Sequence, residues 1–167
     1  YWLTERDLSL PIPDPVLPQG YTIRGAAGIH EAQKLIDVHS NGFGSNWTLA
    51  QYERVMTSPG YSTERELVVV APDGQFAAFC IIWLDDINKI GYFEPVGVHK
   101  AFHRKGLGTA LMRYGMQVMV AQGMALATVL HGVDNLASTG LYASLGFKQT
   151  HPIYDYQLNP QTKDRPE

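Results

Sequence analysis

A basic, glycine-containing stretch, VHKAFHRKGLGTALM at residues 98–112, has the residue types of an anion site. Gly106 and Gly108 carry no Cβ, so the oxygen atoms of an anion can approach their backbone N–H groups closely. If a helix begins here, its first amides have no acceptor within the helix, and its dipole favours negative charge. Arg104 and Lys105 add positive charge beside the glycines. The combination is typical of a phosphate-binding site.

Two common nucleotide motifs do not fit this stretch. The phosphate loop of nucleoside triphosphatases requires G-x-x-x-x-G-K-[ST], which does not occur in the 167 residues. The dinucleotide motif G-x-G-x-x-G requires a third glycine where this chain has Leu111. That motif also follows a parallel βαβ unit, whereas here the preceding segment reads as a hairpin. An NAD-linked oxidoreductase is therefore disfavoured.

The stretch resembles the pyrophosphate loop of the GNAT superfamily of N-acetyltransferases. The pattern of that loop is R/Q-x-x-G-x-G/A at the start of a helix, five residues after a valine that ends a central strand, and this chain has Val98, HKAF and HRKGLG. His103 departs from the pattern at the Arg/Gln position, although histidine can still donate a hydrogen bond to phosphate. The resemblance extends over residues 20–158 and implies acetyl-CoA as co-substrate. The loop residues that it implies as contacts are His103, Arg104, Lys105, Gly106, Leu107, Gly108 and Thr109.

The segment EPVGV at residues 94–98 predicts an interrupted strand. Pro95 cannot donate to a ladder and Gly97 weakens a strand, so both indicate a break in regular pairing. Such a break leaves the backbone of Val96 and Val98 free to bond an extended ligand. The resemblance implies that the pantetheine arm of coenzyme A pairs with residues 96–98. The alternative is an edge strand with a bulge.

A second segment, DNLASTGLYASLGF, supports the same resemblance. Asn135 can cap a short helix, and the resemblance implies that it lies near the pantetheine arm. Tyr142 follows seven residues later, and the resemblance implies that its hydroxyl points at the thioester sulfur. From its own segment alone, Tyr142 is better explained as a core tyrosine with a satisfied hydroxyl, and the loop and strand at matching positions reverse that preference.

Acetyl transfer to an amine requires a base, because an alkyl amine with a pKa of ~10 is protonated at neutral pH. Glu94 is the first candidate, since strand alternation places it on the same face as Val96 and Val98. His131, in VLHGVDN, is the second. A backbone N–H near Val98 would polarise the thioester carbonyl, and by resemblance Tyr142 supplies a proton to the departing thiolate. Either candidate base can instead be a structural or solvated residue.

The acceptor is less well defined by the sequence. The segment HSNGFGSNW combines glycines with Phe43 and Trp47, which gives a loop with aromatic surface. The resemblance implies that this region borders the acceptor site, and a surface connector is the alternative. Asp85 and Asp86 are better explained as a charged turn.

Hydrophobic periodicity predicts the elements that position these residues, in the order βααβββαβαβ. The expected elements are a strand at 20–25, helices at 28–43 and 46–56, two strands within 66–84, a strand at 92–98, a helix from the glycine loop to 122, a strand at 125–130, a short helix at 135–145 and a final strand or hairpin at 147–158. This order indicates an α/β fold, a mixed sheet with helices on both faces. The resemblance adds that the central sheet is mostly antiparallel and opened at one strand.

The composition is that of an ordinary globular domain, with 45% hydrophobic and 17% charged residues. Thirteen basic against 16 acidic residues argue against a dedicated nucleic-acid binder, and no apolar run approaches the length of a membrane span. The one cysteine, Cys80, has apolar neighbours, which favours an inert thiol and a reducing cytoplasm. HEAQK has Lys34 where the zinc motif H-E-x-x-H needs its second ligand, so no metal is expected.

The chain predicts one folded domain over residues 20–158. Four prolines in LPIPDPVLPQG favour a connector, so residues 1–19 are predicted to be a linker or the tail of a preceding domain. Residues 159–167 are predicted to be a polar tail. Because the chain begins with Tyr1, we expect missing upstream sequence, and an upstream domain or a homodimer as partner.

Two functional classes follow from these residues. The leading hypothesis is a cytosolic N-acetyltransferase in which a small-molecule or peptide amine attacks acetyl-CoA directly in a ternary complex. The alternative is a non-catalytic acyl-CoA-binding module that regulates or stabilises a neighbouring domain. The phosphate loop, the interrupted strand and Tyr142 are all present, which favours the enzyme.

Overall fold

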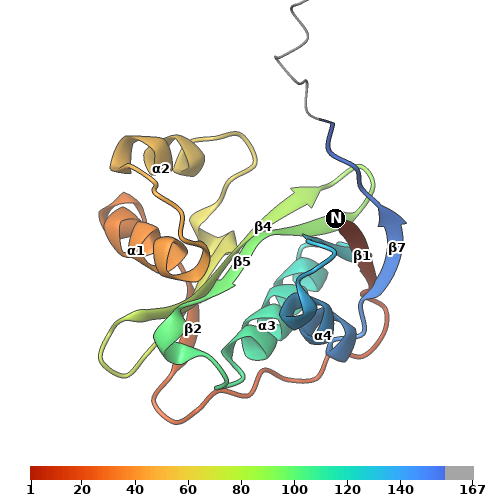
Figure 1. The fold of residues 1–167 in the computed structure, drawn as a ribbon, viewed down its shortest axis with the longest axis horizontal. Helices are drawn as coiled ribbons and strands as arrows, with labels where there is room; N and C mark the ends of the chain where they lie inside the picture. Colours follow the sequence, from red (N-terminus) through yellow and green to blue (C-terminus); the bar gives the residue numbers. More distant parts are fainter. Residues whose placement is uncertain (157–167) are drawn as a thin grey trace, which may run out of the picture.

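The computed structural model describes residues 1–156, and within them seven strands form one sheet in the order β2-β3-β4-β5-β6-β1-β7 (Figure 1). The strands are β1 (Trp2–Asp7), β2 (Thr22–Gly25), β3 (Glu66–Val70), β4 (Phe76–Asp85), β5 (Ile90–Val98), β6 (Leu126–His131) and β7 (Lys148–Pro152). Neighbouring strands are antiparallel except β5 and β6, which are parallel. The predicted α/β class with a mostly antiparallel sheet is confirmed.

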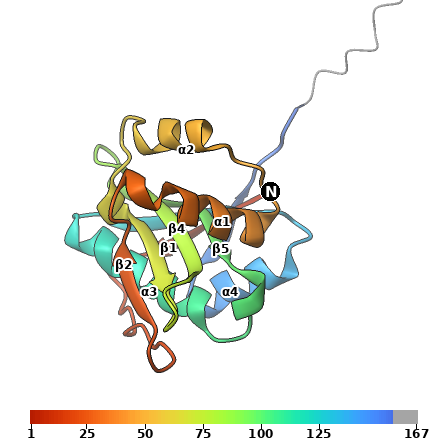
Figure 2. The same ribbon diagram turned by 90° about the vertical axis from the view of Figure 1, so that its left-hand side faces the viewer.

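Helices cover both faces of this sheet (Figures 1 and 2). They are α1 (Ala32–Phe43), α2 (Leu49–Met56), α3 (Leu107–Ala121) and α4 (Leu136–Ser144). Alternation along β4 divides the core: Phe79 packs in the cluster that includes the buried residues of α1 and α2, whereas Ala78 and Cys80 pack in the cluster of α3 and α4. The predicted helices on both faces are therefore confirmed.

The structure corrects the prediction of a linker over residues 1–19. Trp2–Asp7 forms β1, which lies between β6 and β7 and pairs with both. Its inward residues are polar and hydrogen-bonded: Thr4 Oγ1 donates to Val129 O at 3.0 Å, and Arg6 Nε donates to Leu145 O at 2.7 Å. The folded part thus includes β1 and is not limited to residues from 20 onward. The predicted tail at 159–167 lies outside the described residues, as do the last two residues of the predicted domain.

The sheet opens in the middle of β5. Residues 90–93 of β5 pair with residues 126–129 of β6, and the pairing stops at Phe93 and Val129. Beyond that point β5 continues along β4, with a register irregularity between Cys80 and Ile82 that accommodates Glu94 and Pro95. The predicted opening at one strand is confirmed. Among residues 1–156, no helix is long and apolar enough to cross a membrane.

Candidate functional site

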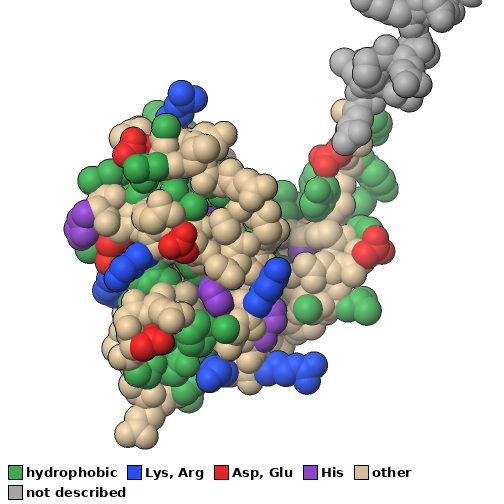
Figure 3. All heavy atoms as spheres, turned by 60° about the vertical axis from the view of Figure 1, so that its left-hand side comes forward, with side chains coloured by type: hydrophobic (Ala, Val, Ile, Leu, Met, Phe, Trp, Pro, Cys, Tyr) green, Lys and Arg blue, Asp and Glu red, His purple; other side chains and the backbone are tan. Residues whose placement is uncertain are grey.

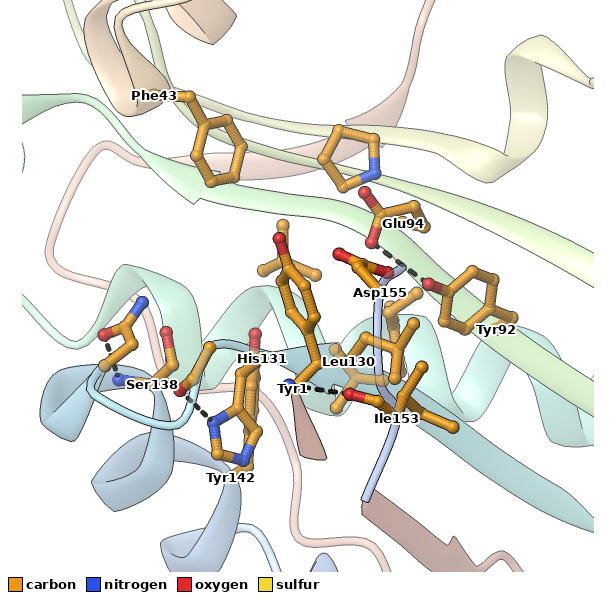
Figure 4. A pocket seen from close by; sticks show the side chains of 16 residues that line it. Tyr1, Phe43, Tyr92, Glu94, Leu130, His131, Ser138, Tyr142, Ile153 and Asp155 are labelled. Atoms are coloured by element: carbon orange, nitrogen blue, oxygen red, sulfur yellow. Dashed lines mark hydrogen bonds between the residues drawn. The ribbon is translucent and has the colours of Figure 1, made fainter. Parts of the chain in front are cut away.

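A cleft of about 480 Å³ lies where β5 parts from β6 (Figure 4). One wall is formed by β5, the other by the end of β6 and by α4, and residues from the two ends of the described chain lie across it. The residues that line it and that the sequence predicted as site residues are Phe43, Glu94, Val96, His131, Asn135 and Tyr142.

The backbone of β5 offers hydrogen-bonding groups to this opening. Val98 lies opposite Ala78, and the N–H of the next residue, His99, donates to Ala77 O at 2.9 Å. In an antiparallel ladder this pattern marks a pair that exchanges no backbone bonds, so the N–H and C=O of Val98 point away from β4. The same holds for Val96, two residues earlier in the same register. Both residues therefore present backbone groups to the opened side, where an extended ligand can pair.

Gly97 has a different role from the predicted one. It stays in register opposite Phe79, so the ladder is interrupted near Pro95 and not at Gly97. A Cβ on Gly97 would lie 2.5 Å from Cζ of Phe79 and 3.2 Å from Cε2 of Phe43. The glycine is therefore needed because two aromatic rings lie directly on the strand.

The predicted anion loop forms the start of α3. Arg104 and Gly106 adopt left-handed backbone angles, with φ of 60° and 74°, and turn the chain into the helix. The first helical bond runs from Ala110 N to Gly106 O at 3.0 Å, so the amides of residues 107–109 have no acceptor within the helix. Arg104 and Lys105 are exposed, and no heavy atom lies within 4 Å of a Cβ built on Gly106. Free amides, open space and two cations fit a pyrophosphate.

Other loop residues contribute in different ways. The side chain of Leu107 is buried, so it can offer a ligand only its backbone. His103 turns back toward β5, with Nε2 3.1 Å from Val98 O. It therefore ties the loop to the strand that it follows. In the space-filling view, several Lys or Arg and His side chains lie close together in the lower right part of the molecule, while others lie at its top and left (Figure 3).

Glu94 lies at the mouth of the opening. Although its side chain reaches solvent, desolvation by the surrounding protein raises the pKa of Glu94. The hydroxyl of Tyr92 donates to Oε2 of Glu94 at 3.2 Å, which opposes part of that rise in pKa. A carboxylate with a raised pKa is better matched to accepting a proton near neutral pH.

Tyr142 and His131 line the other side of the cleft (Figure 4). Burial raises the pKa of Tyr142 to about 12, so the phenol is neutral at pH 7 and can donate a proton or a hydrogen bond. Its ring centroid lies 5.6 Å from that of His131. His131 Nδ1 lies 3.0 Å from Gly132 O. Within residues 1–156, Nε2 of His131 is buried and has no hydrogen-bond partner.

Asn135 caps α4 as predicted. Its Oδ1 accepts a hydrogen bond from Ser138 N at 3.1 Å. The same residue lines the cleft, so the cap also places an amide side chain at the cleft wall.

A second cavity, of about 520 Å³, lies between α1, α2 and the middle of β4 and β5. We call it the aromatic cavity, and its lining residues are His39, Phe43, Ser45, Trp47, Tyr52, Val55, Ile81, Trp83, Glu94 and Pro95. Trp47, predicted as an acceptor contact, lies here and not among the residues of the cleft. Phe43, the other predicted contact, lines both spaces.

Residues 32–147 match the profile of the acetyltransferase (GNAT) family. The chain belongs to this family. It is 29% identical to the mycothiol acetyltransferase of Salinispora tropica, over 94% of this chain and 54% of that protein. It is 26% identical to the mycothiol acetyltransferase of Segniliparus rotundus, over 82% of this chain and 55% of that protein. The chain thus spans about half the length of the curated relatives that it matches.

Solved structures of other GNAT proteins share the fold. The GCN5-related N-acetyltransferase from Sphaerobacter thermophilus superposes with a TM-score of 0.80 at 21% identity, over 90% of this chain and 48% of that chain. The ribosomal-protein-S18-alanine N-acetyltransferase from Escherichia coli gives 0.66 at 20% identity, over 78% and 79% of the two chains. The resemblance inferred from the glycine loop is confirmed at the level of family and fold.

In this GNAT domain the predicted site residues form two groups, one around the cleft beside the middle of β5 and one in the loop that follows β5. Glu94, His131, Asn135 and Tyr142 meet around the cleft, and the anion loop follows the far end of β5. Sequence reasoning missed the residues that complete the aromatic cavity, among them Tyr52 on α2 and Trp83 on β4.

Proposed function

We propose that this GNAT domain transfers an acetyl group from acetyl-CoA to an amine, which attacks directly in a ternary complex. The observation that carries the proposal is the parting of β5 from β6 after Phe93. It creates a cleft with Glu94 on one side and Tyr142 on the other, midway along a strand whose C-terminal end leads into the anion loop.

The loop and the opened strand are suited to holding coenzyme A. The amides of residues 107–109, with Arg104 and Lys105, would bind the pyrophosphate. The outward C=O of Val96 and N–H of Val98 would pair with the amides of the pantetheine arm, because the C=O of Val98 already has His103 as its partner. His103 would act by holding Val98 against the loop, since its Nε2 lies at Val98 O.

Different residues of the cleft would deprotonate the acceptor and protonate the leaving group. Acetyl-CoA supplies the activated thioester. Glu94 would remove the proton from the acceptor ammonium, and the raised pKa of its carboxyl suits that task. One backbone N–H of the opened strand near Val98, that of Val96, would bond the thioester oxygen. Tyr142, neutral because its pKa is about 12, would donate to the departing sulfur. His131 is the second candidate base.

The class of acceptor is a small-molecule or peptide amine. Because the curated relatives are mycothiol acetyltransferases, thiol-bearing amines belong in any test panel. The cytoplasmic location and a partner upstream or in a homodimer stay predictions.

Release of coenzyme A from acetyl-CoA, measured by its thiol or, for thiol-bearing amines, by chromatography, tests the proposal against amines, thiol-bearing amines, aminoglycosides, amino acids and peptides. Calorimetry with coenzyme A runs in parallel. We expect coenzyme A binding and amine-dependent thiol release. Binding without turnover on a broad panel would favour the non-catalytic module, and no binding would contradict both.

A further inference from the structure

The position of the aromatic cavity suggests what kind of amine this domain accepts. We propose that this cavity binds the substituent of the acceptor, and that the acceptor is a primary amine carrying one aromatic or branched aliphatic group. The proposal rests on the proposed function, since it places the reacting amine at Glu94.

The aromatic cavity and the cleft adjoin each other at three shared residues. Phe43, Glu94 and Pro95 line both spaces. Phe43 and Glu94 lie on the same side of the cleft in the close-up view (Figure 4). An amine bound at the Glu94 carboxylate therefore has the cleft on one side and the aromatic cavity on the other. Its substituent can extend into the cavity while its nitrogen faces the cleft.

The walls of the cavity are suited to an apolar group. Trp47 packs edge-on against Tyr52, with ring centroids 6.0 Å apart, and Val55, Ile81 and Trp83 complete the walls. Among the lining residues, all within residues 1–156, Glu94 is the one acidic residue and none is Lys or Arg. With Glu94 engaged by the reacting amine, a charged substituent would lose its hydration here and find as polar partner the buried hydroxyl of Ser45, which has no hydrogen-bond partner within the described residues. An aromatic or branched substituent would instead gain contacts with the rings and aliphatic side chains.

Two of the polar groups that line the cavity are already paired. The hydroxyls of Tyr52 and Tyr61 both donate to the buried carboxylate of Glu66, and His39 Nε2 lies 3.1 Å from the Tyr52 hydroxyl. The His39 ring is also stacked on Phe79, with centroids 3.8 Å apart. Tyr52 and His39 thus present ring surface to the cavity while their hydrogen bonds are directed into this network. The hydrogen bonds of Tyr52 and His39 are therefore made within the protein, and these side chains do not need a polar substrate as partner.

Substrate preference gives the first test. We expect kcat/KM with acetyl-CoA and 2-phenylethylamine to exceed that with ethanolamine by at least about tenfold. The kcat/KM for isoamylamine should be close to that for 2-phenylethylamine. The kcat/KM for kanamycin, which carries several ammonium groups, should be no higher than that for ethanolamine. Equal or better use of ethanolamine or kanamycin would overturn the proposal.

A pair of variants on α2 locates the effect. Val55 lines the cavity, whereas Ala50 is exposed on the same helix and is absent from the lining. Val55→Glu places a carboxylate in the cavity, so kcat/KM for 2-phenylethylamine should fall at least about tenfold while ethanolamine changes less than about twofold. Ala50→Glu, which adds the same charge outside the cavity, should alter neither. Equal losses for both amines in Val55→Glu would contradict the assignment.

Binding separates failure of this inference from failure of the proposed function. Calorimetric titration of 2-phenylethylamine into the coenzyme A-bound domain reports the cavity without catalysis. Binding that Val55→Glu removes and Ala50→Glu retains, without thiol release from any amine, would leave the cavity assignment standing and contradict the proposed reaction. Thiol release without selective binding of 2-phenylethylamine would support the proposed reaction and contradict the cavity assignment.

Discussion

The hydroxyl of Tyr92 donates a hydrogen bond to Oε2 of Glu94, 3.2 Å away and two residues along the same strand (Figure 4). Desolvation raises the pKa of Glu94, and this hydrogen bond lowers it, so the bond tunes the proposed base. Tyr92→Phe keeps the ring and removes the hydroxyl, and the pKa of Glu94 should rise further. Because the base must be deprotonated, we predict that the acidic limb of kcat/KM against pH moves to higher pH. An unmoved limb, or a limb moved to lower pH, would contradict this role.

Tyr142 should act on turnover and not on cofactor affinity. Its phenol is neutral, with a pKa of about 12, and faces the cleft. Tyr142→Phe removes a proton donor used only as the sulfur departs, so kcat should fall about 10²-fold or more. The Kd of acetyl-CoA should change less than about twofold. The measurement is steady-state thiol release combined with calorimetry, and a wild-type kcat in the variant would remove Tyr142 from the mechanism.

Arg104 and Lys105 should contribute to affinity alone. Replacing both with Ala removes two exposed cations beside the amides of the α3 start, and the Kd of coenzyme A should rise about tenfold. The difference from wild type should shrink at high salt, because exposed charges are screened. Lys148→Ala, on β7, is the matched control and should leave the Kd unchanged. A double variant that binds like the control would place the pyrophosphate elsewhere.

Gly97 should be intolerant of a side chain for reasons of packing. Its Cβ would lie 2.5 Å from Cζ of Phe79, which itself stacks on His39. Gly97→Ala should therefore lower the free energy of unfolding by about 1–3 kcal/mol in urea denaturation. Gly140→Ala is the control, because a Cβ there meets nothing within 4 Å. Since Ala is more favourable than Gly in a helix interior, this variant should not be less stable than wild type. A Gly97→Ala protein as stable as wild type would show that Phe79 moves aside freely.

The anion loop and the order of elements were predictable because their causes are local. Gly106, the adjacent cations and the helix that follows lie within a few residues of one another, and each has a fixed physical consequence. The opening of β5 was likewise indicated by Pro95, which cannot donate to a ladder. Gly97, judged by the same rule, instead accommodates the ring of Phe79, a contact between separate strands.

The first strand and the aromatic cavity were not predictable from local pattern. In β1 the inward positions are Thr4 and Arg6, which are buried because distant carbonyls of Val129 and Leu145 accept their hydrogen bonds. Hydrophobic periodicity predicts that polar residues such as these are exposed to solvent. The cavity joins side chains from two helices and two strands, and residues such as Tyr52 and Trp83 look singly like ordinary core aromatics. Their convergence depends on the tertiary fold.

Replacing Glu94 with Gln shows whether the opened strand is a catalytic site. The amide cannot accept the ammonium proton, so kcat for thiol release should fall about 10²- to 10⁴-fold. The Kd of acetyl-CoA by calorimetry should stay within about twofold of wild type, because Glu94 lies apart from the anion loop. His131→Asn, the comparison variant, should lose less turnover than Glu94→Gln. Full turnover in Glu94→Gln, with the loss found instead in His131→Asn, would show that Glu94 is not the base.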